Sequence, residues 1–575
     1  MKYLKLLLFV LLTHWNIFIV WGQPQARLFN LSTYDTLDAD TRKDKAGAFK
    51  KLFAAIAEAG GGVATIPAGD YFLDGKSPVL IPSNTTVYAY GARFFLPEEM
   101  GDMQRAILFK GENISNFSWF GGFFKGYCFD PSKESNTWKP NANTRIFVIS
   151  TTKSGSTCHL LFRDIQSELI AGAVVNVEGL INNETSVPKV EKYASDISVE
   201  NCTLMKSGKF MWDYGFLWQH IVFADEYKAS DLIMAMKYFP EKLTRTNIRI
   251  EKNDNRVYLD NIDNPITVSM SDKPDQVLCF YGDYLPSEII KGKQYYVVAA
   301  DEKYIKISES LNGTPIIFST SANDVKMILN MFEAYYLLYQ PAGSGPGKGC
   351  IDLMACSGTN ISGCTFSSLG DAMHIFCCSD NRFINNQILG ARMGAFFLAE
   401  YSKNSIITGN VIDGNNGSRV MSIERSNENV LVSNNIFRNG GRGSWINQPN
   451  NLIIQNNIFI NNTTKCERNV ARGRKTFRTG TWEEYPEMYF TTYSTDGKYG
   501  NVLLKDNLFT TGPESVSTLH FEKNGFDIRI EGNIFKGANV KIVKDPADST
   551  ITIEKNIGSE AIEEMELAAR KYRNQ

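Results

Sequence analysis

Three stretches of the sequence share one pattern: KNSIITGNVI at residues 403–412, ENVLVSNNIF at 428–437 and NNLIIQNNIF at 450–459. In each stretch, aliphatic residues alternate with polar ones, and an asparagine stands before a second short apolar run. Alternation with a period of two is typical of a β-strand that buries one face. This part of the chain is therefore expected to repeat a unit of strand, asparagine corner and strand.

The unit recurs at a nearly constant interval over the C-terminal half of the chain. The repeat asparagines, each two residues before an Ile, Phe or Gly, are Asn386, Asn410, Asn434, Asn456, Asn507, Asn533 and Asn556. A spacing in the low twenties marks a solenoid with one short coil per repeat, and the leucine-dominated consensus of leucine-rich repeats is absent here. We therefore expect an all-β fold, a right-handed parallel β-helix, in which asparagine side chains bond from coil to coil.

A capping helix is expected before the first coil. Residues 45–73 read KAGAFKKLFAAIAEAGGGVATIPAGDYFL, in which an amphipathic helix over 46–59 meets three glycines and then a strand. A helix at this place closes the open end of a stacked-strand core. The stretch resembles the N-terminal segment of the pectate lyase superfamily, where a similar helix and glycine-rich turn precede the first coil.

The period breaks twice, which sets the expected domain limits. Residues from about 240 to 340 read as hairpin-like strands, and PAGSGPGKG at 341–349 reads as a flexible linker. The second break is a loop at 462–500. The expected parts are a signal peptide at 1–22, the N-terminal part of the β-helix at 23–239, an inserted small β-rich domain at 240–345, and the C-terminal part at 346–575.

The N-terminus predicts export. Lys2 and Lys5 precede an apolar run that continues to Trp21, and Gly22 suits a cleavage site before Gln23. An uncleaved membrane anchor is the alternative. No later segment is apolar for long enough to span a bilayer, so we expect a periplasmic or secreted protein without a membrane span after cleavage. A net charge of -2 and a pI of about 6.3 give no indication of nucleic-acid binding.

The ten cysteines do not suggest a disulfide framework. Half of them lie among small and apolar residues in strand-like runs: Cys350, Cys356, Cys364, Cys377 and Cys378. Most are expected to be small buried residues, two or three of them could pair, and the spacing does not say which. No CxxC pair or neighbouring histidine marks a metal site. We therefore expect that the protein requires no cofactor, although it could bind a divalent cation such as Ca²⁺.

Counting back from the repeat asparagines aligns polar residues of neighbouring coils. The count predicts that His374, Glu400 and Glu424 point outward from one sheet, that the two glutamates stack on adjacent coils, and that Asp352 is in register with His374. Two stacked carboxylates need a proton, a cation or an arginine between them. The candidate catalytic residues are His374, Glu400, Glu424, Tyr401 and His220. The alternative is a solvated polar face with Arg419 and Arg425 as partners.

A local excess of arginine and aromatic residues suggests how a substrate is held. Arginine binds carboxylate or sulfate groups bidentately, and aromatic rings stack on sugars. The loop at 462–500 is the clearest example, with a solvated loop paired to its own glutamates as the alternative. The candidate binding residues are Arg392, Arg419, Arg425, Arg442, Arg468, Arg472, Trp138, Arg145 and Trp218. The expected partner is an acidic polysaccharide or oligosaccharide, and export makes nucleic acid a poor fit.

These residues support three functions. The first is β-elimination on a uronic acid, in which arginine neutralises the carboxylate and His374 or Tyr401 removes the proton. The architecture resembles β-helix lyases and related uronate-processing proteins of Bacteroidota polysaccharide-degradation systems, which implies a lyase or a dehydratase. Their best-known Lys/Arg and calcium-site motifs are not recognisable here. The second function is a glycoside hydrolase with Glu400 and Glu424, without the polygalacturonase motifs. The third is a non-catalytic carbohydrate-binding β-helix.

Overall fold

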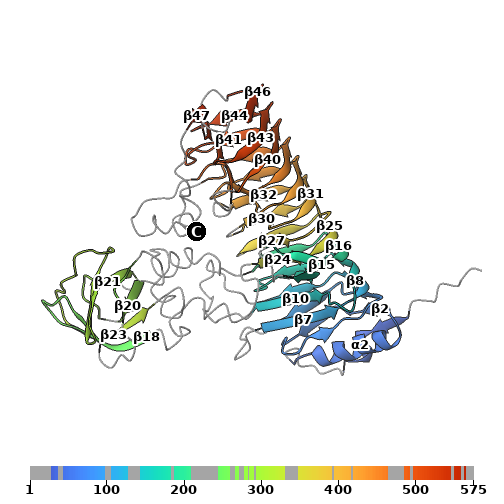
Figure 1. Cartoon of the computed structure of the whole chain (residues 1–575). Helices are drawn as coiled ribbons and strands as arrows, with labels where there is room; N and C mark the ends of the chain where they lie inside the picture. Colours follow the sequence, from blue (N-terminus) through green and yellow to red (C-terminus); the bar gives the residue numbers. More distant parts are fainter. Residues whose placement is uncertain are drawn as a thin grey trace, which may run out of the picture.

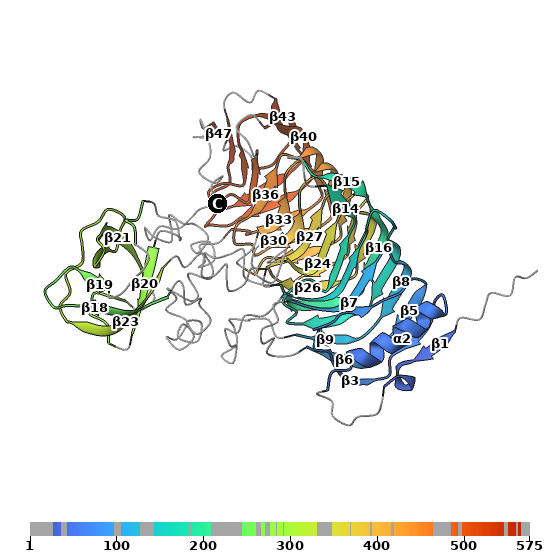
Figure 2. The same ribbon diagram turned by 60° about the horizontal axis from the view of Figure 1, so that its bottom comes forward.

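The chain folds as the predicted right-handed parallel β-helix, with an N-terminal helix and an inserted β-barrel, in a computed structural model (Figures 1 and 2). Successive coils contribute strands to three long parallel sheets, in the repeating chain order sheet C, sheet A, sheet B. The structure describes residues 27–35, 43–96, 105–126, 143–182, 187–208, 244–259, 266–270, 277–282, 284–290, 293–329, 348–368, 370–391, 394–415, 419–463, 485–492, 497–545, 550–558 and 562–564.

The three sheets run the length of the described solenoid. Sheet A contains β1 (Leu28–Asn30), β2 (Gly62–Thr65), β5 (Thr85–Tyr88), β8 (Ser115–Phe120), β11 (Cys158–Arg163), β16 (Ala194–Glu200), β25 (Cys356–Ser362), β28 (Arg382–Ile384), β31 (Lys403–Thr408), β34 (Glu428–Ser433), β37 (Asn450–Gln455), β40 (Tyr499–Lys505), β43 (Gly525–Glu531) and β46 (Ile551–Glu554). Sheet B contains β3 (Gly69–Phe72), β6 (Ala92–Phe95), β9 (Phe123–Lys125), β12 (Gln166–Glu168), β17 (Thr203–Ser207), β26 (Thr365–Ser368), β29 (Gln387–Ile388), β32 (Val411–Asp413), β35 (Ile436–Arg438), β38 (Ile458–Ile460), β41 (Leu508–Thr511) and β44 (Ile534–Gly537). Sheet C contains β4 (Val79–Leu80), β7 (Arg105–Glu112), β10 (Asn143–Ser150), β13 (Val175–Glu178), β24 (Lys348–Met354), β27 (Asp371–Phe376), β30 (Gly394–Leu398), β33 (Arg419–Ile423), β36 (Ser444–Asn447), β39 (Met488–Thr491), β42 (Leu519–Phe521), β45 (Ile542–Lys544) and β47 (Ile562–Glu564).

The cap is the helix α2 (Ala46–Glu58), which covers the first coils after β1 and the short 3-10 turn η1 (Leu31–Thr33). Its apolar face is fully buried, and the Phe49 ring meets Tyr71 edge-on at 5.7 Å and Phe109 at 6.0 Å. The helix therefore closes the end of the core with aromatic side chains, as a stacked solenoid requires at its terminus.

Buried asparagines form the expected ladder at the corner between sheets A and B. The backbone N–H of Asn410 donates to Oδ1 of Asn435 at 2.9 Å, and Asn435 in turn donates to Oδ1 of Asn457 at 2.9 Å. In two coils the asparagine predicted for the ladder is wrong by one residue. Asn434 and Asn456 adopt a positive φ at the turn, and the asparagine that follows each of them points inward and forms the ladder. Asparagine tolerates that backbone conformation better than most residues, so both positions of the NN pair favour it.

The inserted part is a six-stranded antiparallel barrel with its own core. Its strands close in the order β18 (Thr244–Ile250), β19 (Val257–Leu259), β22 (Tyr304–Ser308), β21 (Gln294–Ala300), β20 (Val277–Tyr281) and β23 (Ala322–Leu329). A smaller antiparallel hairpin, β14 (Leu180–Asn182) with β15 (Lys189–Lys192), leaves the solenoid between sheets C and A. The barrel enters the chain between β17 and β24, yet sheet pairing continues across that point, so the insertion does not interrupt the stacking of coils.

Candidate active site

A row of side chains on sheet C runs through the middle of the solenoid. Strand register aligns Asp352 with His374 and Ser422 with Trp445, and the pairing of Ile375 with Leu398 puts Phe397 beside His374. These residues alternate with buried aliphatic neighbours, so they face away from the core. The register of Asp352 with His374 is the one counted from the sequence.

His374 and Asp352 form a hydrogen-bonded pair within this row. The distance between His374 Nδ1 and Asp352 Oδ1 is 2.8 Å, and their side chains are 11% and 4% exposed. An aspartate on Nδ1 favours the tautomer that carries its proton there, which leaves Nε2 as the proton-accepting nitrogen. The Phe397 ring meets the imidazole edge-on at 5.5 Å and the Phe376 ring lies nearly parallel to it at 6.0 Å, so two aromatic side chains pack beside the histidine.

A chain of hydrogen bonds extends from this pair over two further coils. Asn176, fully buried on β13, donates from Nδ2 to the backbone oxygen of Asp352 at 3.2 Å. Arg145, on β10, donates from Nη1 to Asn176 Oδ1 at 2.8 Å and lies 3.8 Å from Glu178. Arg145 was expected to bind substrate, and the structure brings it into the cluster of the dyad although it is only 8% exposed.

The two predicted glutamates lie near the row, but each has an arginine partner. Glu400 forms an ion pair with Arg425, and Glu424 lies 3.3 Å from Arg419. The guanidinium of Arg419 also stacks on the Trp445 ring, 4.3 Å from its centroid. Each glutamate carboxylate is thus paired with an arginine, and one of these arginines also contacts an aromatic ring.

The predicted direct stacking of Glu400 on Glu424 is wrong by one residue. Leu398 pairs with Ile423, so Glu400 is opposite Arg425 and Glu424 is opposite Ala399. The count assumed that each coil has the same length between strand and asparagine, whereas these lengths vary by one residue and the ladder uses Asn435 in place of Asn434. A shift of one residue in a strand moves a side chain to the opposite face, so this error decides which groups meet.

The remaining predicted residues divide into three groups. Tyr401 has a φ of 56° at the corner where the chain leaves sheet C, and its N–H donates to the Arg425 oxygen at 3.0 Å. Arg442 is buried, with 2% of its surface exposed. The others lie outside the described residues: His220, Trp218, Trp138, Arg392, Arg468 and Arg472.

Sequence reasoning missed two parts of the site. Asn176 lies before the insertion, and the asparagine count begins after it, so no register could be counted across the gap. A second polar group on sheet C was also missed: the Tyr489 and Thr491 hydroxyls both hydrogen-bond the Glu522 carboxylate, and His520 lies edge-on to the Tyr489 ring at 5.0 Å. The signal that could have found it is the register of Trp445, Tyr489 and His520 on successive coils.

The described part of the chain offers no group of three or more His, Cys, Asp or Glu side chains that could hold a metal ion. None of its helices has the length and hydropathy needed to cross a membrane. The side chains at the site are a histidine oriented by an aspartate, two arginine–glutamate pairs and a half-buried aromatic surface.

Comparison with known proteins concerns the fold. The family described as "Right handed beta helix region" matches residues 343–481, and no curated protein matches the sequence. The A-module of mannuronan C-5 epimerase AlgE6 from Azotobacter vinelandii is 9% identical, with a TM-score of 0.48 over 92% of this chain and 98% of that one. The Streptococcus pneumoniae adhesin PfbA (11%, TM-score 0.46) and an exopolygalacturonase from Thermotoga maritima (11%, TM-score 0.41) each cover 92% of this chain and 91% of theirs. These likenesses carry no argument about function, and the three parallel sheets together with the family match identify the chain as a right-handed parallel β-helix protein.

Proposed function

We propose that the protein is an enzyme that cleaves or dehydrates uronic-acid-containing saccharides by β-elimination on sheet C. The observation that carries the proposal is the His374–Asp352 pair, 2.8 Å apart on sheet C, with the Phe376 and Phe397 rings beside the imidazole. The Arg419–Trp445 contact lies on later coils of the same sheet. A histidine held by an aspartate in this way is suited to act as a general base.

The reaction needs three groups, and the cluster offers two of them. His374 Nε2 would remove the proton on the carbon next to the uronate carboxylate, and Arg425, with 35% of its side chain exposed, would neutralise that carboxylate. The electron pair then forms the double bond as the C–O bond at the neighbouring carbon breaks. The leaving oxygen takes a proton from solvent water, to which His374 returns the proton that it removed. Asp352 acts as a positioning residue for His374, and Tyr401 is a second candidate for proton transfer.

The pairing of the glutamates favours elimination over hydrolysis. A glycoside hydrolase needs one protonated carboxyl group as its general acid. Glu400 and Glu424 each face an arginine, which stabilises the ionised carboxylate and removes it from that role. A non-catalytic carbohydrate-binding function would also use the arginine and tryptophan surface, but it gives no reason for a buried aspartate behind His374.

A screen of acidic polysaccharides and their oligosaccharides, read by two signals, tests the proposal. Elimination creates a conjugated double bond that absorbs near 235 nm (roughly), whereas hydrolysis releases reducing ends without this absorbance. We expect absorbance to rise with at least one uronate-containing substrate. Reducing ends alone would support a hydrolase, and neither signal on any substrate would support a binding protein.

Two variants then test the dyad. His374→Ala is expected to lower kcat at least about 100-fold, and Asp352→Asn to lower kcat and shift the pH profile with little change in KM. His159→Ala is the matched control, because His159 also lies 3.4 Å from an aspartate, Asp196, but is exposed on sheet A. Full activity of His374→Ala would refute the assignment of the base.

A further inference from the structure

The insertion creates a seam in the solenoid, which we define as the contact between the coil that ends with β17 and the coil that begins with β24. Strands β13, β16 and β17 pair across the seam with β24, β25 and β26. These partners are more than 150 residues apart in sequence, so the seam joins two halves that the chain connects only through the long insertion. Closing a loop costs conformational entropy that rises with loop length, so these contacts cost more to form than contacts between consecutive coils.

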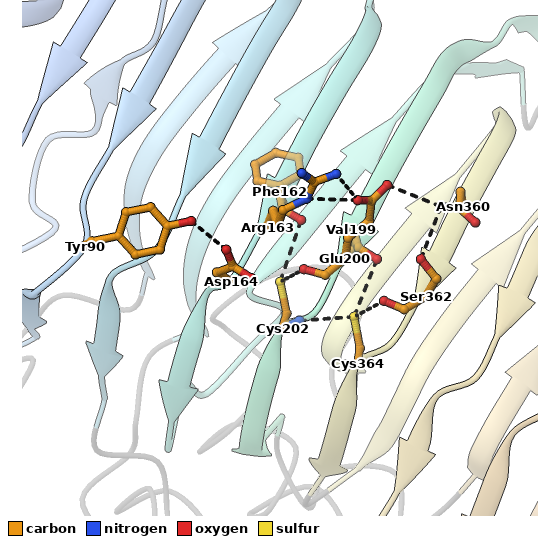
Figure 3. Close-up of polar contacts among 10 residues, drawn as sticks. All are labelled: Tyr90, Phe162, Arg163, Asp164, Val199, Glu200, Cys202, Asn360, Ser362 and Cys364. Carbon is orange, nitrogen blue, oxygen red and sulfur yellow. Dashed lines mark hydrogen bonds and ion pairs between the residues drawn. The ribbon is translucent and has the colours of Figure 1, made fainter.

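Cysteines replace the ladder asparagine on both sides of this seam. Thr203 pairs with Thr365, which places the preceding residues, Cys202 and Cys364, opposite each other at the corner of sheets A and B. The N–H of Cys202 donates to Cys364 Sγ at 3.4 Å, and the N–H of Cys364 donates to Asn386 Oδ1 at 3.0 Å, so the asparagine ladder continues from Cys364. Figure 3 shows the two cysteine side chains on neighbouring strands beneath the Arg163–Glu200 pair and Asn360.

A second cysteine pair stacks at the next coil, at the corner between sheets C and A. The N–H of Cys356 donates to Cys378 Sγ at 3.3 Å, and Ser402 and Asn427 continue this ladder in the following coils. Beyond these coils the described ladder residues are serine or asparagine. Cysteine is therefore concentrated at the seam and its neighbouring coil, where the backbone connection between coils is longest.

We propose that Cys202 and Cys364 form a disulfide bond across the seam in the exported protein, and that Cys356 and Cys378 form a second one beside it. In the structure all four are free thiols that donate to backbone oxygens, so the side chains of each pair would have to turn toward each other to form the bond. Neighbouring in-register strands are about 4.8 Å apart, which lies within the Cα separation that disulfides accept. In each bond, two thiols lose two protons and two electrons as the S–S bond forms. A disulfide oxidant of the export compartment accepts them and becomes two thiols.

The bond is expected to form during folding, before the coils close. All four thiols are buried in the folded chain, with at most 1% of each residue exposed. The Cys364 contact and burial raise the pKa of the Cys202 thiol well above its usual value, and burial does the same for Cys356. Since the thiolate is the reactive form, a pair that reached the folded state reduced would oxidise slowly.

Differential alkylation of the full chain tests the proposal. The protein is exported to an oxidising periplasm, unfolded in denaturant with one alkylating reagent, then reduced and treated with a second reagent before peptide mapping. We expect the second label on Cys202, Cys364, Cys356 and Cys378, and the first label on Cys279, a buried barrel cysteine that serves as the internal control. The first label on Cys202 and Cys364 would overturn the proposal.

A variant separates the bond from the ladder. Ser402 accepts a backbone N–H in the same type of ladder, so the Cys202→Ser/Cys364→Ser double variant keeps a hydrogen-bonding side chain at both positions. Reductant is expected to lower the melting temperature of the exported wild type by roughly 5 °C and to lower that of the double variant by clearly less. An equal response of the two proteins to reductant would contradict the cross-link at the seam.

Discussion

The histidines of this chain differ in the neighbours that the solenoid gives them. His374 is nearly buried beside two phenylalanine rings with Asp352 on Nδ1, whereas His159 is exposed beside Asp196 on another sheet. The sequence surrounding each is strand-like, so local pattern does not separate them. The difference comes from the side chain that the next coil places beside each ring, and this makes His374 the residue to test for catalysis.

Glu487 provides a pH-dependence test at the residue scale. It is 1% exposed, accepts backbone N–H bonds from Asn462 and Gly512, and burial raises its pKa to about 7. Because the folded pKa lies above the unfolded value near 4.5, the buried carboxyl stabilises the fold at low pH. That stability is lost as the pH rises from about 4.5 through about 7, by about 3 kcal/mol in total.

Glu487→Gln should remove this decline, because the neutral amide has no charge to desolvate. The measurement is the melting temperature of wild type and variant between about pH 4.5 and 8, with Glu554→Gln, an exposed position, as the control. Identical slopes for the Glu487 variant and the wild type would contradict a protonated Glu487 in the folded chain.

At the scale of one coil, the inner asparagine corner holds neighbouring turns together. Asn435 donates to the backbone oxygens of Ile407 and Ser433 and to Asn457, and it accepts from Asn410. All of these groups are buried, where an unmade hydrogen bond costs more than a made one contributes. Stacked phenylalanines follow the same corner: Phe437 and Phe459 lie 4.8 Å apart with nearly parallel rings.

The two asparagines of the NN pair should therefore differ in their effect on stability. Asn435→Ala leaves several buried groups without partners and should lower the free energy of unfolding by about 3 kcal/mol. Asn434 is exposed and has a φ of 56°, a backbone conformation that alanine adopts less readily than asparagine. Asn434→Ala should therefore lower the free energy of unfolding by only about 1 kcal/mol. Urea unfolding of both variants measures the difference, and a larger loss for Asn434→Ala would contradict the observed ladder register.

At the scale of the whole molecule, the barrel leaves and rejoins the solenoid at adjacent points. A Cβ placed on Gly208 would lie 3.1 Å from Gly349 Cα, so the backbone before and after the insertion passes within contact distance. The barrel core, which includes Ile248, Phe280 and Tyr295, is separate from the core of the β-helix. The two folding units therefore meet through the chain rather than through a shared core.

Removal of the insertion should leave the β-helix intact. Residues 209–347 replaced by two glycines would connect points that are already adjacent, and a shorter loop lowers the closure cost at the seam. We expect a soluble protein with an unchanged strand signal in circular dichroism and a melting temperature no lower than that of the wild type. A variant that fails to fold would show that the barrel supports the solenoid.

The sequence by itself determined the class of fold, with its cap and an inserted β-domain. The period in the low twenties, the amphipathic helix ending at three glycines, and the loss of period near residue 240 are local features, and each can be recognised without its partners. The register of Asp352 with His374 also followed from counting, because Cys364 and Asn386, from which the count ran, are as far apart in the sequence as Asp352 and His374.

Only the tertiary structure decided which side chains meet. The pairing of Glu400 with Arg425, the burial of Arg442 and the link from Arg145 through Asn176 to Asp352 depend on coil lengths that vary by one residue and on strands paired across the insertion. Because side chains alternate between the two faces of a strand, a difference of one residue in coil length moves a side chain to the opposite face. Sequence periodicity therefore specifies the solenoid, whereas the chemistry on its surface depends on the register of each individual coil.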